Sequence, residues 1–112
     1  MGKDQWLKRQ FAWSERLGIS LPALGQDWEA LSRSQQEAVL ARWEDERGRI
    51  PDRIKRLEEQ INVRQDALYQ EEDFIASCRL NDDIAELASR INDLQIWFRT
   101  QQDLEEETKR HG

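Results

Sequence analysis

The stretch from residue 51 to 107 constrains the fold more than any other part of the chain, because after Pro51 it contains neither glycine nor proline. It is dense in Glu, Gln, Arg, Leu and Ile, a composition typical of long helices. Apolar residues in its second half recur at alternating intervals of four and three, which keeps one side of a helix facing a partner helix. These residues are Leu80, Ile84, Leu87, Ile91, Leu94 and Phe98.

The same pattern in the first half of the stretch is out of phase with the second. Ile54, Leu57 and Ile61 begin it, and it then thins to Leu68 and Ile75. A slip of two residues separates the two halves, whereas the usual irregularities of a paired helix insert three or four. A reversal of the chain explains the slip, so we expect an antiparallel hairpin. The alternative is one unbroken rod that pairs with a second chain.

We expect the reversal between Cys78 and Ile84. Asn81 can cap the returning helix, and Asp82 and Asp83 then fall in its first turn, where the helix dipole favours negative charge.

This reversal has two consequences for the hairpin. It sets Ile75 opposite Leu87 and Leu68 opposite Leu94. It also gathers carboxylates at the tip, namely Glu71, Glu72, Asp73, Asp82 and Asp83.

The first 50 residues carry four of the five tryptophans and predict short helices. Asp4 can cap a first helix that Gly18 ends. Its apolar residues are Trp6, Leu7, Phe11, Trp13 and Leu17. Residues 19–26 are too apolar for a flexible linker and predict an ordered connector, after which Asp27 can start a helical turn.

A further helix is expected from about Gln35 to Arg47. Ser34 and Glu37 have the spacing of a capping box at its start, and Gly48 can end it in a left-handed conformation. Pro51 then suits the first turn of the long stretch.

These elements predict one all-α domain over residues 1–112. It comprises Trp-rich N-terminal helices (1–50), a long, coiled-coil-like helical hairpin (51–107) and a frayed tail (108–112). We expect two or three shorter N-terminal helices to brace the open end of the hairpin and leave the acidic tip projecting.

Charge and cysteine content exclude several classes of function. The net charge of −6 lies wholly in residues 51–112, and an acidic rod repels phosphate, so we expect neither nucleic acid nor a membrane surface as partner. The single cysteine, Cys78, excludes an internal disulfide. No secretion signal or apolar stretch of membrane-spanning length is present, which predicts a cytoplasmic protein.

The sequence lacks the usual groups of an enzyme. Its one histidine, His111, is next to last, and Cys78 has no partner base. No metal-binding or phosphate-binding motif occurs, and the tip carboxylates lack the Gly turn and carbonyl ligands of a cation site. We therefore expect no catalytic, cofactor or metal site.

We expect instead a non-enzymatic protein-interaction module, adaptor or regulator, with an unidentified protein partner. The candidate contact residues are Trp6 and Trp13, as aromatic anchors, and the tip residues Glu71, Glu72, Asp73, Asp82 and Asp83. An alternative is self-association as a homodimer, either a dimeric rod or a four-helix bundle. A further alternative is action on RNA polymerase, by analogy of architecture alone with acidic-tipped hairpin factors of bacterial transcription.

Overall fold

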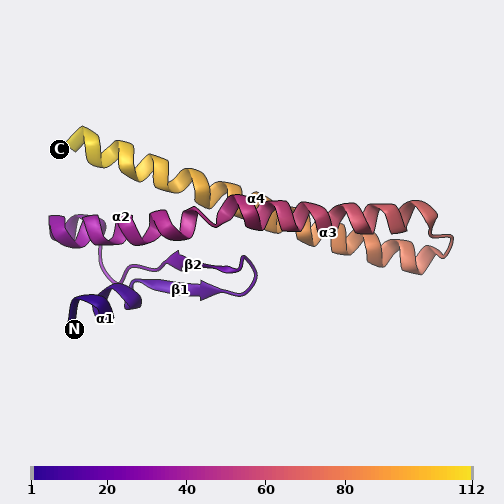
Figure 1. Cartoon of the computed structure of the whole chain (residues 1–112), viewed down its shortest axis with the longest axis horizontal. Helices are drawn as coiled ribbons and strands as arrows, with labels where there is room; N and C mark the ends of the chain where they lie inside the picture. The colour runs from indigo at the N-terminus through magenta and orange to yellow at the C-terminus, as the bar shows by residue number, and fades with distance from the viewer. Residues whose placement is uncertain (1, 112) are drawn as a thin grey trace.

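The computed structural model describes residues 2–111, and it describes side chains within residues 4–100. Figure 1 shows α3 and α4 as two antiparallel helices that extend from a base where the other elements gather. The molecule measures 59 × 30 × 20 Å. In chain order its elements are α1 (Gly2–Arg9), β1 (Phe11–Ser14), β2 (Ile19–Pro22), a 3-10 turn η1 (Trp28–Ala30), α2 (Arg33–Arg47), α3 (Ile50–Gln70) and α4 (Phe74–His111).

The predicted antiparallel packing of two long helices is confirmed, but the predicted turn position is wrong. The chain reverses at Glu71–Asp73, and residues 78–84 lie within an unbroken helix. Asp73 is the cap: its Oδ2 accepts a hydrogen bond from the backbone N–H of Ala76 at 2.9 Å. Asn81 therefore caps nothing. The turn was predicted too late in the chain because Ile75 was taken as part of the helix seam, whereas its side chain is 61% exposed.

The new turn changes which residues face one another. With the reversal centred on Glu72, residues whose numbers add to about 144 lie level on α3 and α4. Leu57 is then level with Leu87, and Ile50 with Leu94, and all four side chains are buried. The expected pairing of Leu68 with Leu94 is wrong by several helical turns.

The prediction of an all-α fold is wrong at residues 11–22, which form an antiparallel pair of strands. The first helix ends at Arg9, and the strand register pairs Phe11 with Pro22 and Ser14 with Ile19. Aromatic and β-branched residues suit strands. Gly18 does not cap a helix but ends the turn between the strands, with φ of 72°.

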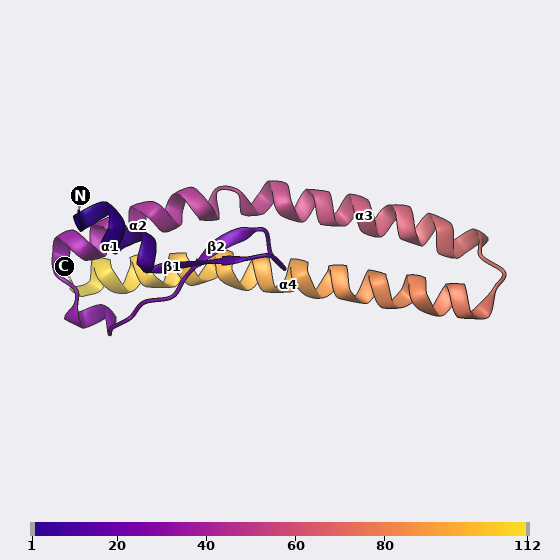
Figure 2. The ribbon, with the colours of Figure 1, turned by 90° about the horizontal axis from the view of Figure 1, so that it is seen from below.

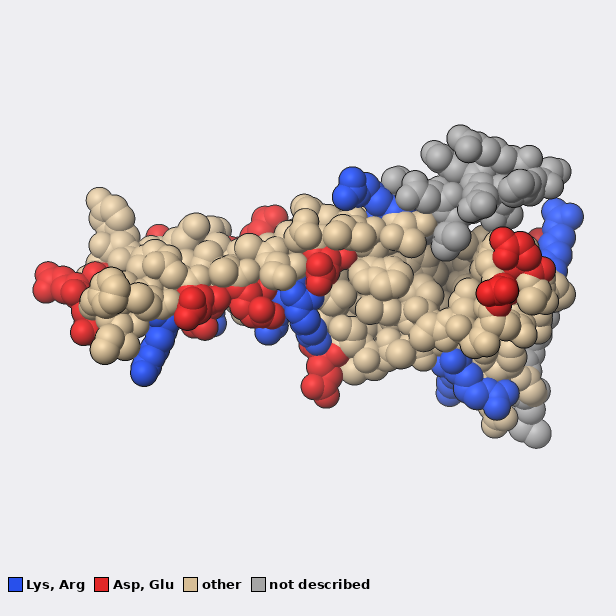
Figure 3. All heavy atoms as spheres, turned by 180° about the vertical axis from the view of Figure 1, so that it is seen from behind, with Lys and Arg blue, Asp and Glu red and all other residues tan. Residues whose placement is uncertain are grey.

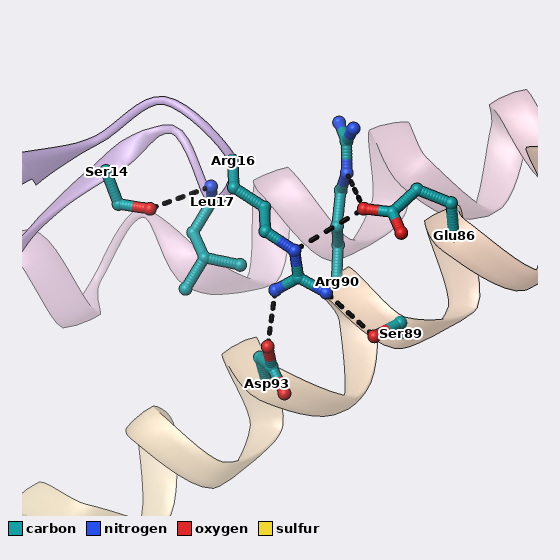
Figure 4. A network of polar contacts seen from close by, with 7 residues as sticks. All are labelled: Ser14, Arg16, Leu17, Glu86, Ser89, Arg90 and Asp93. Atoms are coloured by element: carbon teal, nitrogen blue, oxygen red, sulfur yellow. Dashed lines mark hydrogen bonds and ion pairs between the residues drawn. The ribbon is translucent and has the colours of Figure 1, made fainter.

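The turn of this β-hairpin is held on α4 by Arg16 (Figure 4). The Arg16 guanidinium pairs with Asp93, lies 3.4 Å from a carboxylate oxygen of Glu86, and donates to Ser89 Oγ at 2.7 Å. Neighbouring Leu17 is buried. One arginine thus links the N-terminal strands to the middle of α4.

Two further polar contacts hold the strands against α2 and α3. Arg53 Nε of α3 donates to the carbonyl of Leu17 at 3.2 Å. Glu46 of α2 is 2% exposed; it accepts from Ser20 N–H at 3.1 Å and from Arg42 at 2.6 Å. Because the buried carboxylate has a cation and a backbone donor, its desolvation is compensated.

Helix α2 begins two residues earlier than expected. Ser32 and Gln35 form the capping box, not Ser34 and Glu37, because the Ser32 hydroxyl accepts from Gln35 N–H at 3.1 Å and the Gln35 side chain reaches back to Ser32. Gly48 is right-handed, with φ of −62°, so the predicted left-handed stop is wrong.

Helix α3 follows α2 after Gly48, and the two helices lie one after the other along α4 (Figures 1 and 2). Two smaller expectations are confirmed: Pro51 lies in the first turn of α3, and η1 follows Asp27. Helix α4 runs to His111, and the fraying expected for residues 108–112 stays a prediction. Gly112 lies outside the described residues.

The core lies at the base. Its buried residues come from the β-hairpin and from α2, α3 and α4: Leu17, Ile19, Trp43, Ile50, Leu57, Leu87 and Leu94. Trp43 packs edge-on against Trp97 with ring centroids 5.7 Å apart. Residues 58–86, which we call the arm, contain no buried side chain. The arm is therefore a two-helix projection from a braced base.

We expect the substitution Gly18→Ala, in the turn between β1 and β2, to destabilise the fold. A Cβ at Gly18 would lie 2.6 Å from the Arg53 guanidinium, and φ of 72° is unfavourable for alanine. We expect the free energy of unfolding to fall by about 1–2 kcal/mol, measured by urea denaturation. Gly25→Ala is the matched control because nothing lies within 4 Å of its added Cβ. Equal stability of the two variants would contradict this account.

Candidate functional site

Large apolar side chains are exposed around the turn between α3 and α4. Tyr69 is 93% exposed, Phe74 79% and Ile75 61%. They account for half of the six large hydrophobic residues that are exposed among those the structure describes. We call residues 69–75 the tip. Its apolar side chains contribute little to the fold, so the tip is the strongest candidate for a contact surface.

Three consecutive carboxylates lie between these apolar residues. Glu71, Glu72 and Asp73 are all exposed, and Figure 3 shows acidic side chains at this end of the molecule. Glu71 Oε1 accepts from Asp73 N–H at 3.1 Å, and Asp73 caps α4. Glu72 makes no hydrogen bond or ion pair within the described part of the chain. The tip therefore combines negative charge with two aromatic rings.

The structure separates the predicted acidic cluster into two parts. Glu71, Glu72 and Asp73 are at the turn, but Asp82 and Asp83 lie more than two helical turns back along α4. Asp83 faces α3, where its carboxylate lies 3.7 Å from Arg64 Nε. The expectation that all five carboxylates form one tip is wrong, since the turn precedes Phe74.

The two tryptophans proposed as anchors do not share a helix face. Trp6 is half-buried on α1, whereas Trp13 lies on β1 and is 60% exposed. Both belong to the base, so neither lies with the tip carboxylates. Trp13 remains an exposed aromatic ring.

Sequence reasoning missed Tyr69 and Phe74, although a signal was present. Both are aromatic, and neither falls on the seam once the turn is placed at Glu71–Asp73. The sequence signal for Tyr69 and Phe74 is a pair of aromatic residues on either side of a run of carboxylates at a capped turn.

An open groove of about 630 Å³ lies between α3 and α4 at the base. It is lined by Ile50, Pro51, Ile54, Gln95, Phe98 and Arg99. Arg47 stacks over the Phe98 ring, with its guanidinium carbon 3.9 Å from the ring centroid. The groove therefore has an apolar floor beside two cationic side chains.

The described residues offer no cluster suited to metal chemistry. No group of three or more His, Cys, Asp or Glu side chains among them could hold a metal ion. Cys78 is exposed, and the side chain of His111 lies outside the described residues. Within the described chain, no helix combines the length and apolar character that a membrane crossing requires.

Comparison with known proteins finds no matching family model, no similar curated protein and no similar solved structure.

The cap at the tip predicts how three substitutions rank in stability. Asp73→Ala removes the acceptor for Ala76 N–H, and we expect a loss of about 1 kcal/mol in the free energy of unfolding. Asp73→Asn keeps a good cap while removing the charge, so its loss should be much smaller. Asp82→Ala, at an exposed site inside α4, is the control. Thermal or urea unfolding measures all three, and a ranking with Asp82→Ala as the least stable would refute the assigned turn.

Proposed function

We propose that the protein is a non-enzymatic protein-interaction module that presents the tip to a partner protein. The observation that carries this proposal is the exposure of Tyr69 and Phe74 beside Glu71–Asp73. Aromatic side chains are the commonest anchors of protein interfaces, because they bury a large rigid area at a low cost in conformational entropy.

The magnitudes favour a binding role for the rings over a structural one. A fully buried Phe side chain contributes about 1.5–3 kcal/mol relative to an exposed one. Phe74 is 79% exposed and Tyr69 93% exposed, so almost none of this is realised in the free chain. Transfer of both rings into a partner would supply a useful fraction of the roughly 8 kcal/mol of a micromolar complex.

The tip also indicates the chemistry of the partner. Three adjacent carboxylates fit a surface with Lys or Arg at its rim, and such charges mainly raise the association rate and select the partner. Aromatic rings on either side need apolar recesses. We therefore expect an apolar pocket with a basic rim, on a protein rather than on a polyanion.

The arm acts as a spacer in this proposal. The last buried pair of the seam is Leu57 and Leu87, and the turn lies 15 residues beyond it, or about 22 Å at the rise of an α-helix. A two-helix projection can enter a recess that a wider domain cannot. Action on RNA polymerase is a narrower form of this proposal. In that case the acidic residues of this chain that act on the polymerase would be Glu71, Glu72 and Asp73.

Substitution of the two exposed rings tests the proposal. We expect Tyr69→Ser with Phe74→Ser to weaken partner capture at least tenfold, because two anchors are lost, while the free energy of unfolding changes little. The measurement is affinity capture of the full chain with quantitative mass spectrometry, followed by titration of each captured protein. Val63→Ser is the control, since Val63 is 66% exposed but lies outside the tip.

A protein that depends on both rings and not on Val63 would support the tip as the contact surface. Recovery of the same proteins, in the same amounts, with the double variant would exclude it.

A further inference from the structure

Between Phe74 and Phe98, the charged side chains of α4 are confined to one side of the helix. Six occur in this interval, and at about 100° of rotation per residue all six fall on one face. They are Arg79, Asp82, Asp83, Glu86, Arg90 and Asp93. Arg16 of the β-turn contacts Glu86 and Asp93, so this face lies toward the N-terminal strands.

The opposite side of α4 carries no charge over the same length. Its residues recur at intervals of 4, 4, 3, 4 and 3, and we call them the uncharged stripe: Ser77, Asn81, Ala85, Ala88, Asn92 and Gln95. All are exposed except Ser77, which is half-buried. In a chain with 36% charged residues, an exposed helix face of this length without a charge is unexpected. Depletion of charge is typical of the centre of an interface.

The uncharged stripe joins the two features described above. Gln95, at one end, lines the groove with Phe98 and Arg99. Phe74, at the other end, precedes Ser77 by three residues, lies on the same side of α4 and is 79% exposed. A continuous surface thus runs from the groove to an aromatic ring of the tip, opposite the strands.

The order of residues along the stripe is nearly the same in both directions. Two alanines lie at its centre, an asparagine follows on either side, and a small or amide side chain ends it. A two-fold interface places the same surface on both partners, so antiparallel helices must match a residue near one end with a residue near the other.

If two copies of α4 pair antiparallel about the midpoint of the stripe, residues whose numbers add to 172 or 173 lie level. Ala85 then faces Ala88 of the second copy, where small side chains let two helices approach closely. Asn81 faces Asn92, and an amide can both donate to and accept from another amide.

The same register is complementary at the ends of the stripe. Phe74 of each copy lies level with Phe98 and Arg99 of the other, where the apolar groove is open. Asp73 lies level with Arg99, so the acidic turn meets the cationic side of the groove. Because the two-fold axis repeats each contact, Phe74 meets a groove and Asp73 meets Arg99 at both ends of the pairing.

We propose that the uncharged stripe and the groove bind a second copy of this chain, forming an antiparallel dimer with α4 against α4 and Phe74 of each copy in the groove of the other. This goes beyond the proposed function, which needs only one copy, and Phe74 then serves either the dimer or the partner protein. The dimer covers one side of the otherwise two-layered arm. It leaves Tyr69, Ile75 and the charged face of α4 outside the α4 pairing.

Sedimentation equilibrium of the full chain tests the dimer. We expect a mass of twice 13.4 kDa at high concentration, with dissociation on dilution. Ala85→Glu sets a carboxylate at the centre of the stripe in both copies and should raise the dissociation constant at least 100-fold. Ala67→Glu, at an exposed alanine of α3 outside the stripe, is the matched control and should leave it unchanged. A monomer at every concentration, or a dimer unaffected by Ala85→Glu, overturns the proposal.

Cys78 tests the orientation of the two copies. It is the only cysteine and it is exposed, so a nitroxide label on it reports only distances between copies. In the antiparallel register the two Cys78 positions are about 16 residues apart along the paired helices, or about 24 Å. A distance of about 25–35 Å by pulsed dipolar spectroscopy supports this register. A parallel pair brings the labels much closer, and a short distance excludes the proposal.

Failure of this inference is distinguishable from failure of the proposed function. Ala85→Glu leaves the tip unchanged, so a monomeric Ala85→Glu chain that still captures its partner separates self-association from partner binding. Loss of the dimer in Phe74→Ser, with the dimer retained in Tyr69→Ser, is the expected pattern for the groove contact. The reverse pattern counts against the assigned register.

Discussion

The seam between α3 and α4 is the interaction on which the rest of the structure depends. Leu57 lies level with Leu87 across it, and Ile50 with Leu94, and all four side chains are almost fully buried in one core cluster. Each such side chain contributes about 1.5–3 kcal/mol relative to exposure. The seam also fixes the register, because a shift of one helical turn would move the buried leucines out of alignment. With the register fixed, the turn falls at Glu71–Asp73, and the aromatic rings beside it are exposed in the single chain.

The N-terminal segment uses a different chemistry to attach to this seam. Its buried apolar residues, Leu17 and Ile19, are few, and the contacts around them are polar. Arg16 contacts α4, Arg53 donates to the carbonyl of Leu17 in the turn between the strands, and Glu46 accepts from strand β2. The Arg16 pairs specify position more than they add stability, since they are partly exposed and such ion pairs contribute little. The strands are thus placed on one side of α4, and its uncharged side is left open.

The hairpin could be predicted from the sequence because its apolar residues recur over many helical turns. This recurrence indicates two paired helices even when the turn between them is placed wrongly. The turn could not be predicted, because the seam was extended to Ile75, and Asp73 resembles any other acidic residue until its bond to Ala76 is seen. The strands were missed for a related reason. Phe11 and Trp13 fit a helix face as well as a strand, and only tertiary contacts of Arg16 and Leu17 decide between them. Tyr69 and Phe74 were not predicted as contact residues because neither lies on the seam.

The absence of buried side chains in the arm has a consequence for motion. At the base, strands and α2 add further layers to α3 and α4, whereas residues 58–86 form two helices with solvent on both sides. Local stability follows the amount of apolar area that opening must expose. The helical turns next to the tip can therefore separate first, while α3 and α4 stay packed together at the base. Amide hydrogens should exchange in that order, and a bound partner would slow the outermost amides first.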